Sequence, residues 1–244
     1  MKIRLFTFPN LLTLANLVCG VLAILFALRY DNLPAAFLAI VVAAVFDFCD
    51  GFAARLLKQY SELGVQLDSL SDIVSFGVAP ASVLFVLYNQ AEPWAGTNPA
   101  LSDGLGHLVW IVAAFSSLRL AKFNIDQTQH TEFVGLPTPA NALLIASLGA
   151  LVATGTLSLA RIPILVLALL LSWLLISPIR MFSLKFNGFG WRGNELRYSF
   201  LLGSVLLLIL FRTAGVPWII ALYIVVSTIR FTLQSLRRKQ ESKN

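Results

Sequence analysis

Residues 47–72 read DFCDGFAARLLKQYSELGVQLDSLSD and place four aspartates between two apolar segments. The flanking residues, 41–46 and 73–88, are almost wholly apolar, as in a protein that spans a membrane. An ionised carboxylate at the centre of a bilayer costs about 2.5–3.5 kcal/mol on insertion scales. Four such groups in one place need a counter-charge, and a divalent metal ion would supply it.

The spacing of the four acids predicts that they meet in one site. Asp47 and Asp50 are separated by three positions and Asp68 and Asp72 by four, so each pair shares one face of a helix. A turn around residues 59–61 would fold the two helices together as a hairpin. The sequence therefore predicts an acidic site between two helices at their shared end.

Ion pairing and zinc binding account less well for the acidic cluster. Buried ion pairs with Arg55 and Lys58 would neutralise two of the acids and leave two unpaired. Zinc is not indicated, because the histidines are isolated and the two cysteines, Cys19 and Cys49, lie inside apolar segments. Carboxylate oxygens instead favour Mg²⁺ or Mn²⁺.

The composition predicts an all-α fold, a polytopic membrane helical bundle. Hydrophobic residues make up 58% of the chain and charged residues 12%, which lies outside the range of soluble globular domains. Residues 1–244 read as one integral membrane domain, with a core at about 8–142, additional helices over 143–235 and a basic tail at 236–244. About eight segments approach the spanning length of roughly 20 residues: 10–29, 34–57, 66–88, 106–123, 138–155, 162–177, 198–212 and 217–235.

The basic residues predict the orientation. With eight spans, only three of the 18 lysines and arginines, Arg29, Arg161 and Arg212, fall on the side opposite to the termini. The positive-inside rule then puts both termini and the acidic site in the cytoplasm, in a protein of the cell inner or plasma membrane. The net charge of +6 is explained by attraction to membrane lipids, and no nucleic-acid partner is expected.

The acidic stretch fits the pattern D-x2-D-G-x2-A-R-x8-G-x3-D-x3-D at every fixed position and resembles the signature of the CDP-alcohol phosphotransferases. In that family an alcohol attacks a CDP-linked lipid and CMP leaves. The resemblance implies a pair of Mg²⁺ or Mn²⁺ ions and a homodimer.

The resemblance also implies roles for individual residues. Asp47, Asp50 and Asp68 match the metal ligands. Asp72 matches the base that takes the proton from the attacking hydroxyl, and it is also a candidate metal ligand. The expected nucleotide and diphosphate site comprises Asn10, Thr13, Gly51, Ala54, Arg55 and Gly64, although helix capping and packing would equally explain Asn10 and Thr13.

A second segment, RLAKFNID at 119–126 followed by FVGLPTPANA at 133–142, makes the chain similar to the phosphatidylserine synthases of this family. The resemblance runs from about residue 8 to residue 141 and implies CDP-diacylglycerol and L-serine as substrates. Serine needs a cation for its carboxylate and acceptors for its ammonium group. The candidates are Arg119 or Lys122 for the carboxylate, and Asn124, Asp126 or Asn141 for the ammonium group.

Two alternatives stay open. The same chemistry could serve another acceptor, glycerol 3-phosphate or an inositol phosphate, which should need a tighter basic cluster than Arg119 and Lys122 offer. A cation channel or transporter is the alternative of a different class. The fixed glycine, alanine and arginine positions of the signature argue against it, because a bare ion site does not need them.

Overall fold

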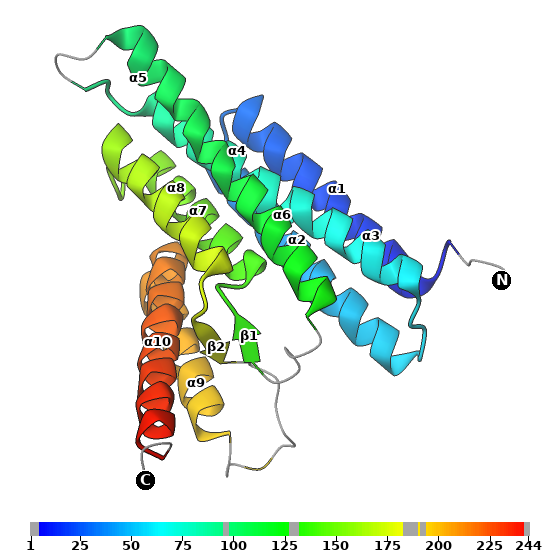
Figure 1. Cartoon of the computed structure of the whole chain (residues 1–244). Coiled ribbons are helices and arrows are strands. Elements are labelled where there is room, and N and C mark those ends of the chain that lie inside the picture. The colour runs from blue at the N-terminus through cyan, green and yellow to red at the C-terminus, as the bar shows by residue number, and fades with distance from the viewer. Residues whose placement is uncertain (1–4, 95–97, 127–131, 183–189, 191–193, 242–244) are drawn as a thin grey trace.

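A computed structural model of the chain describes residues 5–94, 98–126, 132–182, 190 and 194–241. Helices form a bundle, and one small sheet joins two connectors (Figure 1). In chain order the elements are α1 (Phe8–Leu28), α2 (Leu33–Leu56), α3 (Glu62–Asp72), the π-helix η1 (Ile73–Val78), α4 (Ala79–Gln90), α5 (Pro99–Leu105), the 3₁₀-helix η2 (Gly106–Trp110), α6 (Ile111–Ile125), β1 (Glu132–Val134), α7 (Thr138–Ala153), α8 (Arg161–Ile176), β2 (Arg180–Phe182), α9 (Glu195–Phe211), the 3₁₀-helix η3 (Arg212–Ala214) and α10 (Gly215–Glu241).

Local sequence explains where the first three helices begin. The side chain of Thr7 accepts a hydrogen bond from the main-chain N–H of Asn10, and Asn32 does the same for Ala35. Ser61 accepts from the N–H of Gly64 at the start of α3. Such N-caps satisfy N–H groups that have no partner within the helix. The turn predicted around residues 59–61 therefore ends at the N-cap of α3, but α2 and α3 do not pack along each other as the predicted hairpin would.

The predicted helical, apolar character is confirmed, but the count of eight spans is not. Five helical runs in the described residues are long and apolar enough to cross a membrane: Phe8–Leu28, Leu33–Leu56, Glu62–Gln90, Pro99–Ile125 and Glu195–Leu233. The predicted spans at 138–155 and 162–177 correspond to α7 and α8, which have 16 residues each and are shorter than such spans.

The last two predicted spans correspond to the run Glu195–Leu233, which folds back on itself. Arg212 has a positive φ of 49° at the end of α9, and α9 then packs against α10 (Figure 1). Helix α10 continues to Glu241, so most of the predicted tail at 236–244 is helical, and residues 242–244 lie outside the described part.

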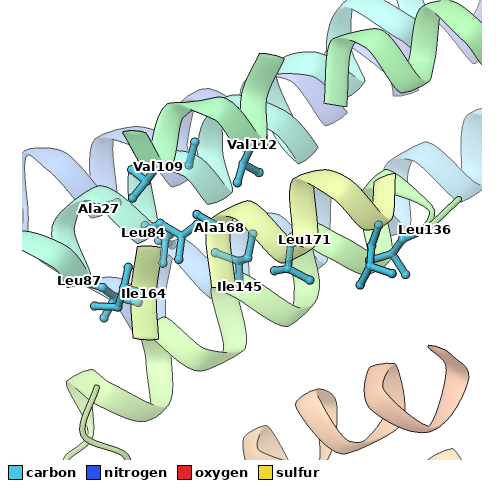
Figure 2. Packing of buried hydrophobic residues seen from close by; sticks show 14 of the residues in the cluster. Ala27, Leu84, Leu87, Val109, Val112, Leu136, Ile145, Ile164, Ala168 and Leu171 are labelled. Atoms are coloured by element: carbon cyan, nitrogen blue, oxygen red, sulfur yellow. The ribbon is translucent and has the colours of Figure 1, made fainter. Parts of the chain in front are cut away.

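Helix α1 is the element that unites the site-bearing helices. It packs along α2 and also along α3, whereas α2 and α3 make little backbone contact with each other. Small residues line the contact of α1 and α2 with η1 and α7, among them Ala23, Ala43 and Ala146, which lets the backbones approach closely. The larger apolar core lies between α4, α7 and α8, where Leu84, Ile145 and several neighbours are buried (Figure 2).

A π-helix, η1, follows Asp72 directly. Its wider turn is visible where the N–H of Ala79 bonds to the carbonyl of Val74, five residues earlier. Pro80, which lacks an N–H, comes directly after the wide turn, in the first turn of α4. Insertions of this kind are frequent at functional sites. The π-helix contacts α1, α6 and α7, so it lies in the centre of the bundle.

The two-stranded sheet departs from the all-α prediction. Strands β1 and β2 pair antiparallel, with Phe133 opposite Met181. Gly135, at φ +79°, lies so close to the carbonyl of Leu175 that a Cβ would clash with it. Because each strand has three residues, no alternating pattern long enough to predict a strand exists in the sequence.

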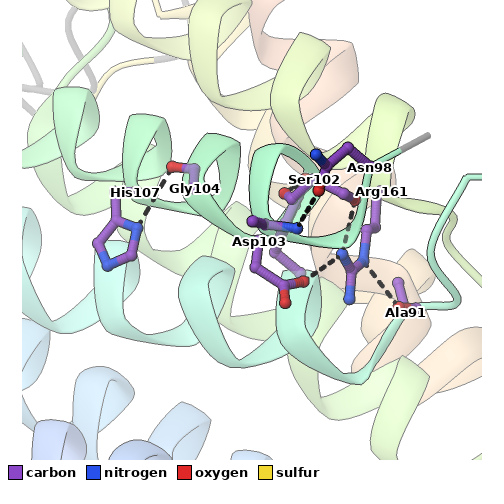
Figure 3. A network of polar contacts seen from close by, with 9 residues as sticks. Ala91, Asn98, Ser102, Asp103, Gly104, His107 and Arg161 are labelled. Carbon is purple, nitrogen blue, oxygen red and sulfur yellow. Dashed lines mark hydrogen bonds and ion pairs between the residues drawn. The ribbon is translucent and has the colours of Figure 1, made fainter.

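Arg161, at the start of α8, is buried at the end of α4 and beside α5. It pairs with Asp103 at 2.8 Å and donates to Ser102 at 2.7 Å and to the carbonyl of Ala91 at 3.0 Å (Figure 3). Its guanidinium also lies over the ring of Tyr88. A buried arginine is stable in such a place only when its donors are paired. This network fixes α8 against the core.

Candidate functional site

Three of the four acids converge. Oxygen atoms of Asp47 and Asp50 on α2 and of Asp68 on α3 all lie within 4.8 Å of one another. Asp50 is buried, and Asp68 has a buried Oδ1 with no hydrogen-bond partner in the described chain. Both α2 and α3 pack against α1. The carboxylates of the two helices therefore meet, although α2 and α3 make little backbone contact with each other.

This donor set fits a hard divalent cation. Carboxylate oxygens are the preferred ligands of Mg²⁺ and Mn²⁺. No lysine or arginine in the described residues forms an ion pair with the three acids, so the alternative in which Arg55 and Lys58 neutralise them is not supported. The unpaired Asp68 Oδ1 provides a further free ligand atom.

Helix α1 supplies polar partners to the acids. Thr13 donates from Oγ1 to Asp50 Oδ2 at 2.6 Å, and Asn16 donates from Nδ2 to Asp72 Oδ1 at 3.1 Å. Asp72 is 7% exposed and lies outside the group of three acids that approach within 4.8 Å. Asp72 is thus held by an amide, and its place differs from that of the three candidate ligands.

A pocket of about 370 Å³ opens beside the acids. Its volume falls within the range of about 300–1,000 Å³ that is usual for small-molecule sites. All six residues predicted for nucleotide and diphosphate binding line it, together with Asp50 and Asp68: Asn10, Thr13, Gly51, Ala54, Arg55 and Gly64.

Gly51 gives this pocket its depth next to the acids. A Cβ built on Gly51 would meet no heavy atom within 4 Å, so the space in front of its backbone is open. Gly64 is more crowded, because a Cβ there would lie 3.1 Å from Ser61 Oγ and 3.4 Å from Asn10 Oδ1. A ligand can therefore approach the backbone of α2 at Gly51.

The five residues predicted for the acceptor fall into different environments. Arg119 and Asn141 are buried inside the bundle, whereas Lys122 and Asn124 are exposed near the end of α6, and Asp126 is half-buried. Asn124 lines the pocket beside the acids and donates to Ser69 at 2.8 Å. The structure thus does not bring the five together.

Arg119 and Asn141 share an unusual feature. Arg119 donates to Thr138 at 3.4 Å and is close enough to Asp72 for their charges to interact, but its Nε has no partner in the described chain. Both amide atoms of Asn141 are likewise buried without a partner among the described residues. Buried polar atoms without partners are uncommon and point to a ligand or an ordered water molecule.

Asn16 and Ser75 were not predicted. Ser75 in η1 donates to the main-chain carbonyl of Asn16 at 3.0 Å, which joins α1 to the segment that follows Asp72. The signal for Asn16 exists in the sequence, because Asn10, Thr13 and Asn16 recur every three positions along an otherwise apolar helix. Nothing in the sequence marks the π-helix that brings Ser75 to α1.

The family model for CDP-alcohol phosphatidyltransferases matches residues 6–178. A CDP-diacylglycerol–serine O-phosphatidyltransferase of Bacillus subtilis is 38% identical over 131 residues, which cover 54% of this chain and 68% of the relative. The protein of the same name from Methanocaldococcus jannaschii is 35% identical over 177 residues, 72% of this chain and 74% of the relative. The one from Mycobacterium tuberculosis is 38% identical over 152 residues, 59% of this chain and 49% of the relative.

Proposed function

Because the chain belongs to the CDP-alcohol phosphatidyltransferase family, we propose that it transfers the phosphatidyl group of CDP-diacylglycerol to the hydroxyl of L-serine. The relatives from Bacillus subtilis and Methanocaldococcus jannaschii carry the name of this reaction. The observation that carries the proposal is the pocket beside Asp50 and Asp68, because it offers an open helix backbone at Gly51 within reach of a cluster of acids.

The reaction exchanges one phosphorus–oxygen bond for another. The serine hydroxyl oxygen attacks the phosphorus that carries the diacylglycerol, the bond from this phosphorus to the oxygen of CMP breaks, and CMP leaves with that electron pair. The hydroxyl proton goes to Asp72, which we assign as the general base. The products are phosphatidylserine and CMP.

Asp47, Asp50 and Asp68 would hold Mg²⁺ or Mn²⁺, and a second ion would also involve Asp72. When bound, the metal neutralises the diphosphate and the charge that develops on the leaving phosphate. Thr13 orients Asp50 through its hydrogen bond, and the open space at Gly51 admits the nucleotide. Arg55, which is exposed at the pocket, is placed to meet a phosphate.

Serine would be selected beside Asp72, at the buried Arg119. The guanidinium of Arg119 is buried, close to Asp72 and incompletely paired in the described chain, so it can bind the serine carboxylate. The unpaired amide of Asn141 can accept from the ammonium group. The entrance to this serine site would be lined by residues nearer the surface, Lys122, Asn124 and Asp126.

The membrane setting follows from the same proposal. The five apolar runs make the chain an integral membrane protein. We place both termini and the acidic site on the cytoplasmic side, because the basic residues predict that orientation. A homodimer is the proposed assembly.

The experiment measures CMP release by the purified protein from CDP-diacylglycerol, with Mg²⁺ or Mn²⁺ and one alcohol at a time. We expect release with L-serine and little with ethanolamine, which lacks the carboxylate, or with glycerol 3-phosphate or an inositol phosphate. Release with a phosphorylated alcohol and not with serine would refute serine as the acceptor, while phosphatidyl transfer would remain the reaction. No metal-dependent release with any of them would refute the enzyme and favour an ion-transport protein.

A further inference from the structure

Asn16 is a fully buried amide in the middle of the apolar helix α1. Its Nδ2 donates to Asp72 Oδ1 at 3.1 Å, and its Oδ1 has no partner in the described chain. Burial of an amide with one end unpaired costs free energy that an apolar side chain of the same shape would not cost. Packing alone therefore does not explain an asparagine at this position.

The main chain of Asn16 binds the same segment a second time. Its carbonyl accepts from Ser75 Oγ at 3.0 Å. One turn further along α1, a Cβ on Gly20 would lie 2.7 Å from the Cα of Ser75, so the two backbones are in close contact. Helix α1 therefore fixes the position of the segment 72–75, and the side chain of Asn16 additionally fixes the carboxylate within it.

The two oxygens of Asp72 are not equivalent. Oδ1 accepts from Asn16, while no described residue donates a hydrogen bond to Oδ2. The terminal torsion of an aspartate is soft, so without a donor the carboxylate would rotate over a broad range. A general base has to lie within about 2.6–3.2 Å of the proton it takes, which a rotating carboxylate seldom satisfies.

We propose that Asn16 is a positioning residue for Asp72: its amide holds Oδ1 and leaves Oδ2 directed at the acceptor hydroxyl. The inference rests on the proposed function, because it takes Asp72 as the base. It assigns to α1 a part in the proton transfer in addition to its part in the nucleotide pocket.

The test compares Asn16→Leu with Ser75→Ala in the full-length protein. Leucine has nearly the shape of asparagine and removes the unpaired buried carbonyl together with the donor. Ser75→Ala breaks the second bond between the same two segments and leaves the amide of Asn16 in place. Both variants lose one link of α1 to the segment 72–75, but only Asn16→Leu loses the contact with the carboxylate.

We expect kcat of Asn16→Leu to fall by about 10- to 100-fold, while KM for CDP-diacylglycerol stays within about twofold. Ser75→Ala should keep kcat within about threefold of wild type and lower the melting temperature. Asn16→Asp, which keeps the shape but sets a carboxylate against Asp72, should lose more activity than Asn16→Leu.

Wild-type kcat in Asn16→Leu would overturn the inference, and so would equal losses of kcat in Asn16→Leu and Ser75→Ala. If Asn16→Leu does not fold, as judged by loss of CMP binding, wild-type kcat in Asn16→Asp would overturn it instead. Rates are measured with whichever alcohol the wild-type protein uses, so an error in the serine assignment does not affect this result. Absence of CMP release from the wild type itself would show failure of the proposed function.

Discussion

Gly51→Ala should raise the stability of the protein and lower its affinity for CDP-diacylglycerol. Gly51 lies inside α2, where glycine costs about 0.5–1 kcal/mol relative to alanine. A Cβ at this position meets no protein atom within 4 Å, so the gain is not offset by a clash. For a chain of 244 residues, about 1 kcal/mol corresponds to a rise in melting temperature of about 2–4 °C.

The added methyl group should contact the bound CDP-diacylglycerol and weaken its binding, because Gly51 lines the pocket of about 370 Å³. Forcing a methyl group into a well-packed contact costs about 1–3 kcal/mol. The dissociation constant for CDP-diacylglycerol should therefore rise by about 5- to 150-fold. Affinity is measured by titration calorimetry in detergent, and stability by thermal unfolding of the same preparation.

Gly203→Ala is the matched control. Gly203 lies within α9, a Cβ there also meets nothing within 4 Å, and it is not among the residues that line the pocket. It should gain the same stability with unchanged affinity. If Gly51→Ala gains stability like Gly203→Ala and binds CDP-diacylglycerol as wild type does, the nucleotide does not lie against Gly51 and the assignment of the pocket is refuted.

Three further predictions concern the acids and the acceptor. Asp68→Asn keeps the shape but loses a charged ligand, so CMP release in Mg²⁺ should fall at least about a hundredfold; near-normal release would contradict its role as a ligand. Asp72→Asn should lose turnover while CDP-diacylglycerol binding persists, and a proportional loss of both, measured by titration, would make it a metal ligand and not a base. Arg119→Lys keeps the charge but loses the two-pronged geometry, so serine titration at saturating CDP-diacylglycerol should show KM raised about tenfold or more, with a larger effect in Arg119→Ala. Wild-type serine dependence in both variants and in Lys122→Ala would leave these cations as topology anchors only.

That Asp47 and Asp50 share one face could be predicted from helical spacing, whereas the residues that line the pocket beside them were taken from the resemblance to the family. Asp47 and Asp50 share one face of α2, and the family signature fixes Asp68 one helix further on. Glycine and alanine stand at set distances from these acids in the signature, and the backbone is open at one of them, Gly51. Local rules of this kind need no knowledge of how distant helices pack.

The features that depend on distant packing escaped prediction. The contact between Asn16 and Asp72 spans 56 positions, and the one between Ser75 and Asn16 spans 59. Arg119 and Lys122 were both candidates for the serine carboxylate, but the structure buries Arg119 and exposes Lys122 near the end of α6. Hydropathy shows that a segment is apolar; it does not show that α7 and α8 are only 16 residues long.

The network around Arg161 has a consequence for biosynthesis. Its partners Ala91, Ser102 and Asp103 precede it by 58 to 70 positions, so the ribosome has delivered all of them before α8 emerges. An arginine buried without partners is costly, and the cost falls when its donors meet a carboxylate and a carbonyl. Because these partners are synthesised first, Arg161 can pair with them as soon as α8 reaches α4 and α5. A substitution at Asp103 should reduce the yield of inserted protein, even though it lies far from the acidic site in the sequence.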